Sequence, residues 1–379
     1  MNLNPLSSFD FDDNRKLSGG SRLLQRFNID APLFFALILL SVIGLIVLYS
    51  AGSQSETLMA KQIVRLFIGF LVMFVIAQLH PTVLFHWTPW IFAGGVLMLV
   101  LVLILGDIGK GAQRWLNLGL FRFQPSELMK LALPMMIAYY LSQSTLPPRK
   151  LRILVCAILL AVPTYLVAKQ PDLGTSLLIA SSGIFALFLA GIRWKLIISL
   201  LIIFAASAPF AWNMLHDYQK RRVLTFINPE NDPLGSGYHI IQSTIAIGSG
   251  GVYGKGWLNG TQSHLDFLPE RSTDFIFAVL SEEFGLIGVL LLLSIYAFIT
   301  ARGLMIASQA QETFTRLLAG SLTLTFFVYV FVNIGMVSGL LPVVGVPLPL
   351  ISYGGTSLVT IMAGFGILMS IKANRKLIG

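Results

Sequence analysis

Charged residues are scarce in this chain of 379 residues, because Asp, Glu, Lys and Arg together make up only 11% of it. A single cysteine, Cys156, lies within an apolar stretch, which excludes an intrachain disulfide and any metal site built from several cysteines. The sequence also lacks a GxxxxGK[ST] loop, an HExxH pair and a GxSxG turn. P-loop ATP hydrolysis, zinc proteolysis and α/β-hydrolase chemistry therefore have no support.

Apolar residues, by contrast, are abundant. They account for 55% of the chain, and the mean hydropathy is +0.79. A soluble domain of this size has no need of such a balance. The net charge of +9 does not indicate nucleic-acid binding, since Lys and Arg form short clusters between long apolar stretches. The composition predicts an all-α polytopic membrane protein with no nucleic-acid partner.

Ten stretches are long enough to cross the roughly 30 Å of hydrocarbon in a bilayer. They lie near residues 32–53, 62–79, 88–106, 126–143, 152–169, 174–190, 196–214, 274–299, 317–340 and 354–371. We expect a membrane domain over 31–372, preceded by a disordered cytoplasmic tail at 1–30 and followed by a short cytoplasmic tail at 373–379. The first span shows no small-residue cleavage site, so we expect it to be retained.

Basic residues indicate how the spans are oriented. They cluster in the N-terminal segment, in short loops and at the C-terminus: Arg15, Lys16, Arg22, Arg26, Arg149, Lys150, Arg152, Arg193, Lys195, Arg302, Lys372, Arg375 and Lys376. An even number of spans places all of them on one side, which the positive-inside rule assigns to the cytoplasm. Both termini are then cytoplasmic, and the segments outside are 54–61, 107–125, 170–173, 215–273 and 341–353.

The longest of these, 215–273 between the seventh and eighth spans, is not a plain connector. It mixes apolar runs with a cluster of glycines: Gly248, Gly250, Gly251, Gly254 and Gly256. A loop of this length with its own apolar residues is expected to fold rather than extend into water, so we predict that it lies against the membrane surface.

Carboxylates at or inside spans are costly, so each is a candidate for function. Glu127 and Lys130 begin the fourth span three residues apart and therefore share a helix face. Two interpretations are open. The residues form an ion pair that neutralises two groups at the headgroup level, or the pair frames a polar cavity.

The eighth span begins with another carboxylate, Asp274. It either caps the helix, whose N-terminus favours negative charge, or serves the chemistry of the protein. Glu282 and Glu283 lie about 12 Å further down the same span, deep enough to need partners. A proton relay and a polar contact between helices are both compatible with their positions.

Five basic residues in the outer segments form the second set of candidates: Arg114, Arg122, Arg221, Arg222 and Lys255. Such groups bind an anionic lipid headgroup or a pyrophosphate, to which Arg donates in bidentate fashion. Solvated loop charge is the competing interpretation.

Six long motifs, in order along the chain, give the sequence a family resemblance. They are KGAQRW (110–115), FQPSELMK (123–130), AKQPDLGTS (168–176), HDYQKRRV (216–223), LPERSTDFIFAVLSEE (268–283) and LPVVGVPLPLISYGG (341–355). Together they resemble the SEDS family (shape, elongation, division and sporulation), and its elongation branch more than its division branch. The resemblance extends from the first span to the last, with no counterpart for residues 1–30.

The resemblance implies a peptidoglycan glycosyltransferase that polymerises lipid II at the outer face of the bacterial cytoplasmic membrane. It also implies a partner, a class B penicillin-binding protein that crosslinks the product. The family's catalytic aspartate falls on Asp274, its Glu and Lys of the fourth span on Glu127 and Lys130, and its loop arginine on Arg222.

In the mechanism expected from this resemblance, Asp274 is the general base of a single displacement. Arg222, with Arg221 or Lys255, stabilises the departing pyrophosphate together with a divalent cation, which the resemblance implies is Mg²⁺ or Mn²⁺. No all-protein cage for that cation is visible in the sequence. Two other functions are also compatible with the chain: a lipid II flippase, which uses intramembrane carboxylates such as Glu282 and Glu283, and a non-catalytic scaffold for the crosslinking partner.

Overall fold

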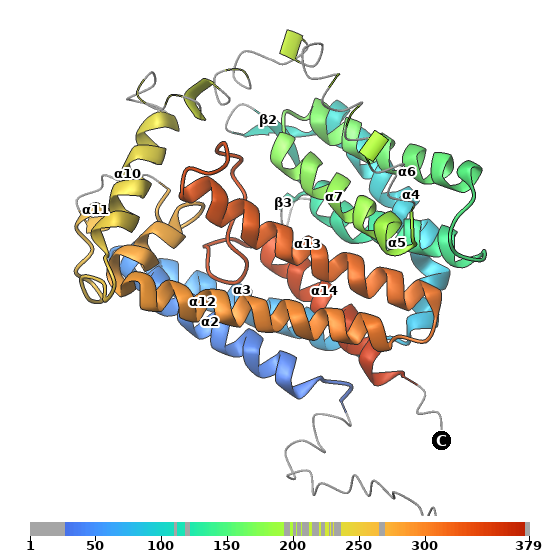
Figure 1. Cartoon of the computed structure of the whole chain (residues 1–379), viewed down its shortest axis with the longest axis horizontal. Coiled ribbons are helices and arrows are strands. Elements are labelled where there is room, and N and C mark those ends of the chain that lie inside the picture. The colour runs from blue at the N-terminus through green and yellow to red at the C-terminus, as the bar shows by residue number, and fades with distance from the viewer. Residues whose placement is uncertain are drawn as a thin grey trace, which may run out of the picture.

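A computed structural model describes residues 27–109, 112–117, 122–192, 236–264 and 270–375, and scattered positions between 198 and 230. The main elements in chain order are α2 (Ala31–Ala51), α3 (Glu56–Ala77), α4 (Pro81–Leu105), β1 (Asp107–Gly109), β2 (Ala112–Asn117), β3 (Arg122–Phe123), α5 (Pro125–Ser142), α6 (Lys150–Lys169), α7 (Leu173–Leu189), α10 (Ser236–Ser249), α11 (Thr261–His264), α12 (Ile276–Gln309), α13 (Thr313–Val337) and α14 (Thr356–Ala373). Figure 1 shows that the long helices run side by side.

Seven of the described helices are long and apolar enough to cross a membrane: α2, α3, α4, α6, α12, α13 and α14. α5 and the shorter apolar helix α7 coincide with the predicted fourth and sixth spans. The predicted seventh span, near 196–214, lies almost entirely outside the described residues, as do residues 1–26 of the predicted tail. The described part of the chain is therefore the helical, polytopic bundle predicted from composition.

Several predicted helix ends were wrong. α3 begins at Glu56 and α4 at Pro81, each well before the apolar stretch that marked it in the sequence. The cause is local: the Ser55 side chain accepts a hydrogen bond from Leu58 N, and proline is favoured in the first turn of a helix. A helix in a bilayer extends into the headgroup region when its first turn is capped in this way.

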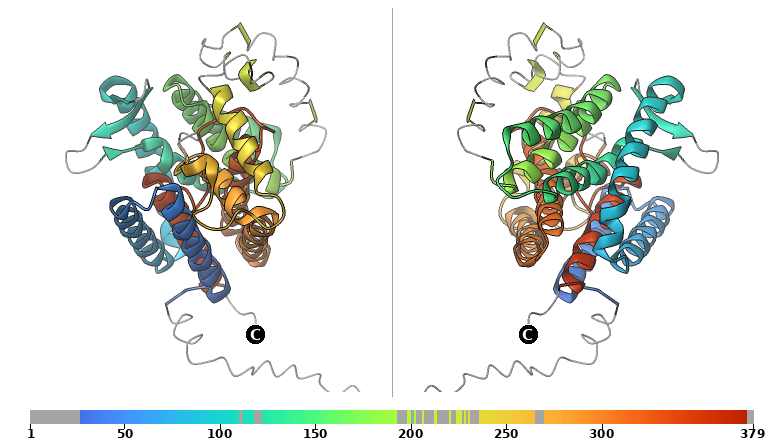
Figure 2. Two further views of the ribbon diagram at one scale, coloured as in Figure 1. Left: turned by 90° about the vertical axis from the view of Figure 1, so that its left-hand side faces the viewer. Right: turned by 90° about the vertical axis from the view of Figure 1, so that its right-hand side faces the viewer.

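The two ends of the bundle differ. At one end, which we name the loop end, lie the connection 52–55, the described parts of the next connection (106–109, 112–117 and 122–124), and residues 170–172, 250–264, 270–275 and 338–355. At the other, the terminal end, lie the short turns 78–80, 143–149 and 310–312 and both ends of the described chain. Figure 2 shows the bundle from two further sides. The predicted loop 107–125 contains an antiparallel sheet in the order β1-β2-β3, which was not predicted.

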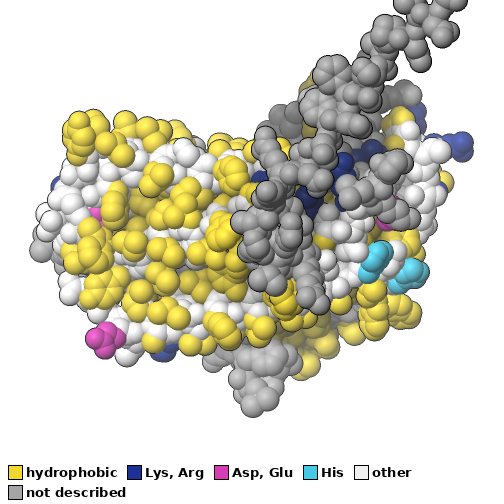
Figure 3. All heavy atoms as spheres, turned by 90° about the horizontal axis from the view of Figure 1, so that it is seen from below, with side chains coloured by type: hydrophobic (Ala, Val, Ile, Leu, Met, Phe, Trp, Pro, Cys, Tyr) yellow, Lys and Arg dark blue, Asp and Glu magenta, His cyan; other side chains and the backbone are white. Residues whose placement is uncertain are grey.

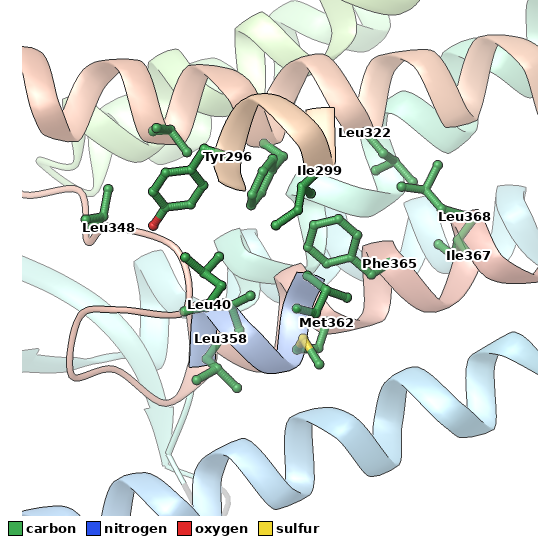
Figure 4. Packing of buried hydrophobic residues seen from close by; sticks show 14 of the residues in the cluster. Leu40, Tyr296, Ile299, Leu322, Leu348, Leu358, Met362, Phe365, Ile367 and Leu368 are labelled. Carbon is green, nitrogen blue, oxygen red and sulfur yellow. The ribbon is translucent and has the colours of Figure 1, made fainter. Parts of the chain in front are cut away.

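The centre of the bundle is filled by apolar side chains from α2, α12, α13 and α14 (Figure 4). The ring centroids of Tyr296 and Phe326 lie 5.9 Å apart, and those of Phe326 and Phe365 lie 5.1 Å apart. The Tyr296 hydroxyl donates to Pro349 O at 2.7 Å, which gives the one polar group of this buried ring a partner. The core thus ties three helices to the 338–355 connection.

The outside of the bundle is apolar as well. Phe67 on α3 is 70% exposed and Trp90 on α4 is 74% exposed. Figure 3 shows hydrophobic side chains spread across the middle of the face that it views. An exposed apolar surface of this extent is stable in lipid and not in water, as expected for membrane spans.

The glycine cluster noted in the sequence has a structural reason. α12 is interrupted at Gly285, where φ is 63°. The backbone groups freed there bond to the 250–256 segment: Lys255 N donates to Glu282 O at 3.0 Å, and Leu286 N donates to Gly251 O at 3.0 Å. A Cβ at Gly250 would lie 2.0 Å from Ser281 O, so only glycine allows this approach. The described part of the predicted loop 215–273 therefore folds against the helix bundle itself.

Candidate active site

Asp274 lies at the loop end, half-buried, just before α12. The N-cap residue of α12 is Phe275, whose side chain makes no capping hydrogen bond, so Asp274 stands one residue before the cap. The interpretation of Asp274 as the cap of this helix was therefore wrong. Its carboxylate lies beside Gly345, where a Cβ would be 3.5 Å from Asp274 Oδ2.

The backbone around Asp274 is fixed by α13 and by the 338–355 connection. Asn333 Nδ2 donates to Asp274 O at 2.9 Å and to Val346 O at 2.7 Å. Ser352 Oγ donates to Thr273 O at 2.6 Å. These neutral donors hold the main-chain carbonyls of Thr273 and Asp274, so the backbone position of Asp274 is set before any substrate arrives.

Asn333 and Ser352 were missed in the sequence. Asn333 is fully buried in α13, and an amide inside an apolar span is a signal that could have been used, since it needs a partner in the interior. The partners of both residues are carbonyls far away in the chain, so their role depends on the folded structure.

The structure brings Glu127 and Lys130 together on α5. Lys130 Nζ donates to Glu127 Oε1 at 2.6 Å, and both side chains are buried. Lys130 Nζ also lies 5.0 Å from the centroid of the Tyr329 ring, within cation–π range. Tyr329 is one helical turn from Asn333, so one face of α13 contacts both the ion pair and the Asp274 segment. Lys130 lines a mostly apolar pocket between α5, α13 and α14, so the pair is a buried ion pair inside the bundle and not the frame of a polar cavity.

Arg114 on β2 contacts α7 in the structure. Its Nε lies 3.5 Å from Asp172 Oδ2, and its Nη2 donates to Pro171 O at 2.6 Å. Asp172 also caps α7 by accepting from Thr175 N at 3.2 Å. An anion that binds Arg114 would have to share this guanidinium with Asp172.

Lys255, another predicted anion-binding residue, is bound to Glu282. Lys255 Nζ lies 2.7 Å from Glu282 Oε1, and the same carboxylate oxygen accepts from Thr261 N at 2.9 Å. Glu283 accepts a short hydrogen bond from Ser50 Oγ on α2. Both glutamates thus hold neighbouring segments to α12, which favours polar packing over a proton relay.

We therefore expect Glu282→Ala to destabilise the protein. The substitution removes charge-assisted hydrogen bonds worth about 1.5–3 kcal/mol each from a fully buried carboxylate and detaches the 250–262 segment. The unfolding temperature in detergent should fall by several degrees, whereas it should not change in Glu312→Ala, a control at an exposed carboxylate. Loss of activity at an unchanged unfolding temperature would instead support the proton relay.

Three of the predicted basic candidates are not placed. Arg221 and Arg222 lie outside the described residues, and only the backbone of Arg122, in β3, is described. Within the described residues, no group of three or more His, Cys, Asp and Glu side chains is arranged to hold a metal ion. The structure thus unites Asp274 with its positioning residues and Glu127 with Lys130, and gives Arg114 and Lys255 carboxylate partners.

Comparison with known proteins identifies the family. A family model described as a cell cycle protein, FtsW/RodA/SpoVE, matches residues 30–377. The peptidoglycan glycosyltransferase MrdB of Escherichia coli K12 is 53% identical over 355 residues, covering 93% of this chain and 96% of that protein. The peptidoglycan glycosyltransferase RodA of Treponema pallidum is 32% identical over 425 residues, covering 92% and 98%.

Comparison with solved structures supports the same family. A chain from a structure on the coordination of polymerization and crosslinking by a peptidoglycan synthase complex has a TM-score of 0.80 and 34% identity, covering 91% of this chain and 98% of that one. The rod shape determining protein RodA of Thermus thermophilus has a TM-score of 0.70 and 28% identity, covering 92% and 98%. The polytopic membrane fold and the enzyme class predicted from the motifs are confirmed. The chain belongs to the FtsW/RodA/SpoVE family of cell cycle proteins, the SEDS peptidoglycan glycosyltransferases.

Proposed function

We propose that this enzyme polymerises lipid II into glycan strands at the outer face of the bacterial cytoplasmic membrane during cell elongation, with Asp274 as its general base. The observation that carries the proposal is the half-buried Asp274 carboxylate at the loop end, whose flanking carbonyls are held by Asn333 and Ser352. Its sequence similarity to MrdB supports the reaction class.

The proposed orientation of the bundle in the membrane follows from the distribution of its basic residues. Arg152, Arg302 and Lys372 belong to helix segments at the terminal end, and the positive-inside rule assigns that end to the cytoplasm. Asp274 is then on the outer side, where the sugar and peptide of lipid II are available for polymerisation. Both termini are cytoplasmic in this arrangement.

The reaction is one displacement. The 4-hydroxyl oxygen of the N-acetylglucosamine on the acceptor forms a bond to the anomeric carbon of the donor, and the bond from that carbon to the pyrophosphate oxygen breaks. Asp274 accepts the hydroxyl proton, and the configuration inverts from α to β. Undecaprenyl pyrophosphate leaves as a stable anion that needs no proton, so a single carboxylate suffices.

The departing pyrophosphate requires fixed positive charge. Arg222 and Arg221 are assigned to it from the family resemblance, while Lys255 and Arg114 would have to exchange or share their carboxylates to take part. A divalent cation, Mg²⁺ or Mn²⁺, supplies further neutralisation of the phosphate oxygens when bound. The Asp274 carboxylate at the loop end fits an ion of this kind, because proteins often hold Mg²⁺ through one or two carboxylates and the phosphates of the substrate.

A class B penicillin-binding protein is the proposed partner that crosslinks the new strands. The likeness of this chain to one in a solved peptidoglycan synthase complex supports such an assembly. Glu127 and Lys130 are positioning residues in this scheme, because the face of α13 that contacts Lys130 also contacts the Asp274 segment.

The test is glycan-strand formation from purified lipid II. The full chain, mixed with its class B partner and Mg²⁺ or Mn²⁺, should yield polymer, and undecaprenyl pyrophosphate should be released in proportion. If an intact, partner-bound protein makes no polymer but moves fluorescent lipid II across vesicle membranes, it is a flippase. If it does neither and only recruits the partner, the scaffold interpretation is correct.

A further inference from the structure

Arg65 lies within the membrane-spanning helix α3 and has no place in the function described so far. It is nine residues after Glu56, so it lies about 13 Å along the helix from the loop end. Its neighbours Val64 and Phe67 are 57% and 70% exposed, which marks a lipid-facing surface, while Arg65 itself is half-buried. A guanidinium at this depth is costly and needs a partner.

The structure gives Arg65 a stacking contact and no acid. The guanidinium carbon lies 4.2 Å from the centroid of the Tyr353 ring. Within the described residues, no carboxylate pairs with Arg65 and no acceptor takes a hydrogen bond from it. Stacking occupies the face of a guanidinium and leaves its five N–H donors, which point outward in the plane, available for an anion.

The N-terminus of α14 adds positive charge at the same place. Its N-cap residue is Gly355, no side chain caps the helix, and a Cβ at Gly355 would lie 3.4 Å from Arg65 Nε. A guanidinium beside the positive end of a helix is unfavourable unless an anion lies between them. This juxtaposition therefore points to a bound anion.

A buried amide next to Arg65 is also incompletely satisfied. Gln62, one turn earlier on α3, is 1% exposed and donates from Nε2 to Ser352 O at 3.4 Å. Its Oε1 is buried and has no hydrogen-bond partner within the described residues. Because this oxygen is an acceptor, it does not itself bind an anion; it is available to a donor group, such as a hydroxyl, of a ligand whose anion contacts Arg65.

The site is directly connected to the Asp274 segment. Tyr353 N donates to Ser272 O at 2.8 Å, and Ser352 Oγ donates to Thr273 O, so the stacked residue and its neighbour both hold the strand that leads into Asp274. The exposed apolar side chains of Val64 and Phe67, next to Arg65 on α3, face lipid in a membrane. The anion is therefore most simply one carried by a lipid.

We propose that Arg65 and the first turn of α14 bind the phosphate groups of a membrane lipid, and that this lipid is one of the two pyrophosphate-linked substrates. The assignment rests on the proposed function, in which two lipid-linked molecules meet at Asp274 and each brings a pyrophosphate. The buried Lys130 is already neutralised by Glu127, whereas Arg65 pairs with no carboxylate in the described part of the chain, so Arg65 is the cation suited to the second pyrophosphate.

Binding of undecaprenyl pyrophosphate to the full chain in detergent tests this site without any need for turnover. Arg65→Gln should raise the dissociation constant at least tenfold, and Arg65→Lys, which keeps the charge and loses the planar fork, should raise it less. Lys61→Gln is the matched control, because it removes an exposed cation one turn earlier on the same helix and should leave binding unchanged. Equal binding by wild type and Arg65→Gln would overturn the proposal.

Two further measurements separate the possible explanations. Phosphatidylglycerol offered as competitor should displace undecaprenyl pyrophosphate poorly; if Arg65→Gln loses only phosphatidylglycerol binding, the ligand is a structural phospholipid and the substrate assignment is wrong. Because Arg65 has no described acid partner, Arg65→Gln should not lower the unfolding temperature, whereas a purely structural arginine would. Wild-type protein that binds undecaprenyl pyrophosphate through Arg65 yet makes no polymer would leave this site standing and overturn the proposed function instead.

Discussion

Replacement of Asp274 by Asn is expected to lower the rate of lipid II polymerisation by about 10²–10⁴-fold, the contribution of a general base, and Asp274→Ala is expected to abolish it. An amide has nearly the same volume but does not accept the proton of the attacking hydroxyl. The rate is measured as glycan-strand yield and undecaprenyl pyrophosphate release with the class B partner present. No other single substitution in the described chain should reduce the chemical step so strongly.

The fold should survive this change. Two hydrogen bonds that fix the Asp274 segment use main-chain carbonyls, which Asn keeps: Asn333 donates to Asp274 O, and Ser352 donates to Thr273 O. Asp274→Asn should therefore retain its unfolding temperature and its binding of the partner, as should Glu312→Gln, an exposed carboxylate at the terminal end that serves as the activity control. Wild-type polymer yield from Asp274→Asn would remove the aspartate from the role of base and favour a scaffold.

Local rules were enough for features that depend on neighbours in sequence. The i, i+3 spacing of Glu127 and Lys130 predicted a shared face, and the two groups are 2.6 Å apart. Apolar length predicted the described spans because a bilayer demands continuous helices with internally satisfied backbones. The position of Asp274 before a long apolar run likewise identified a carboxylate at the loop end.

Features that depend on distant segments could not be predicted in this way. Glu283 bonds to Ser50 across 233 residues, and nothing near either residue in sequence indicates the other. The interruption of α12 at Gly285 requires the 250–256 segment to supply replacement hydrogen bonds. Arg65 was not predicted as a binding residue for the same reason. Its neighbours Tyr353 and the N-terminus of α14 lie beside it only in the folded chain.

The second large effect is expected at the ion pair of α5. Glu127→Ala or Lys130→Met alone leaves an uncompensated charge among buried side chains, and breaking a buried pair by removing one partner costs about 3–5 kcal/mol. Each single variant should therefore unfold at a clearly lower temperature in detergent and polymerise lipid II more slowly, because the face of α13 that contacts Lys130 also holds Asp274 in place.

The double variant distinguishes charge from catalysis. Glu127→Ala combined with Lys130→Met removes both charges, so much of the stability lost in the single variants should return, which a double-mutant cycle would record as a coupling energy between the two sites. If polymerisation returns with stability, the pair acts only by holding α5 against α13. If stability returns while polymerisation stays low, the charges themselves shape the interior that the lipid-linked substrate enters, and Glu127 and Lys130 belong with Asp274 among the residues that the reaction requires.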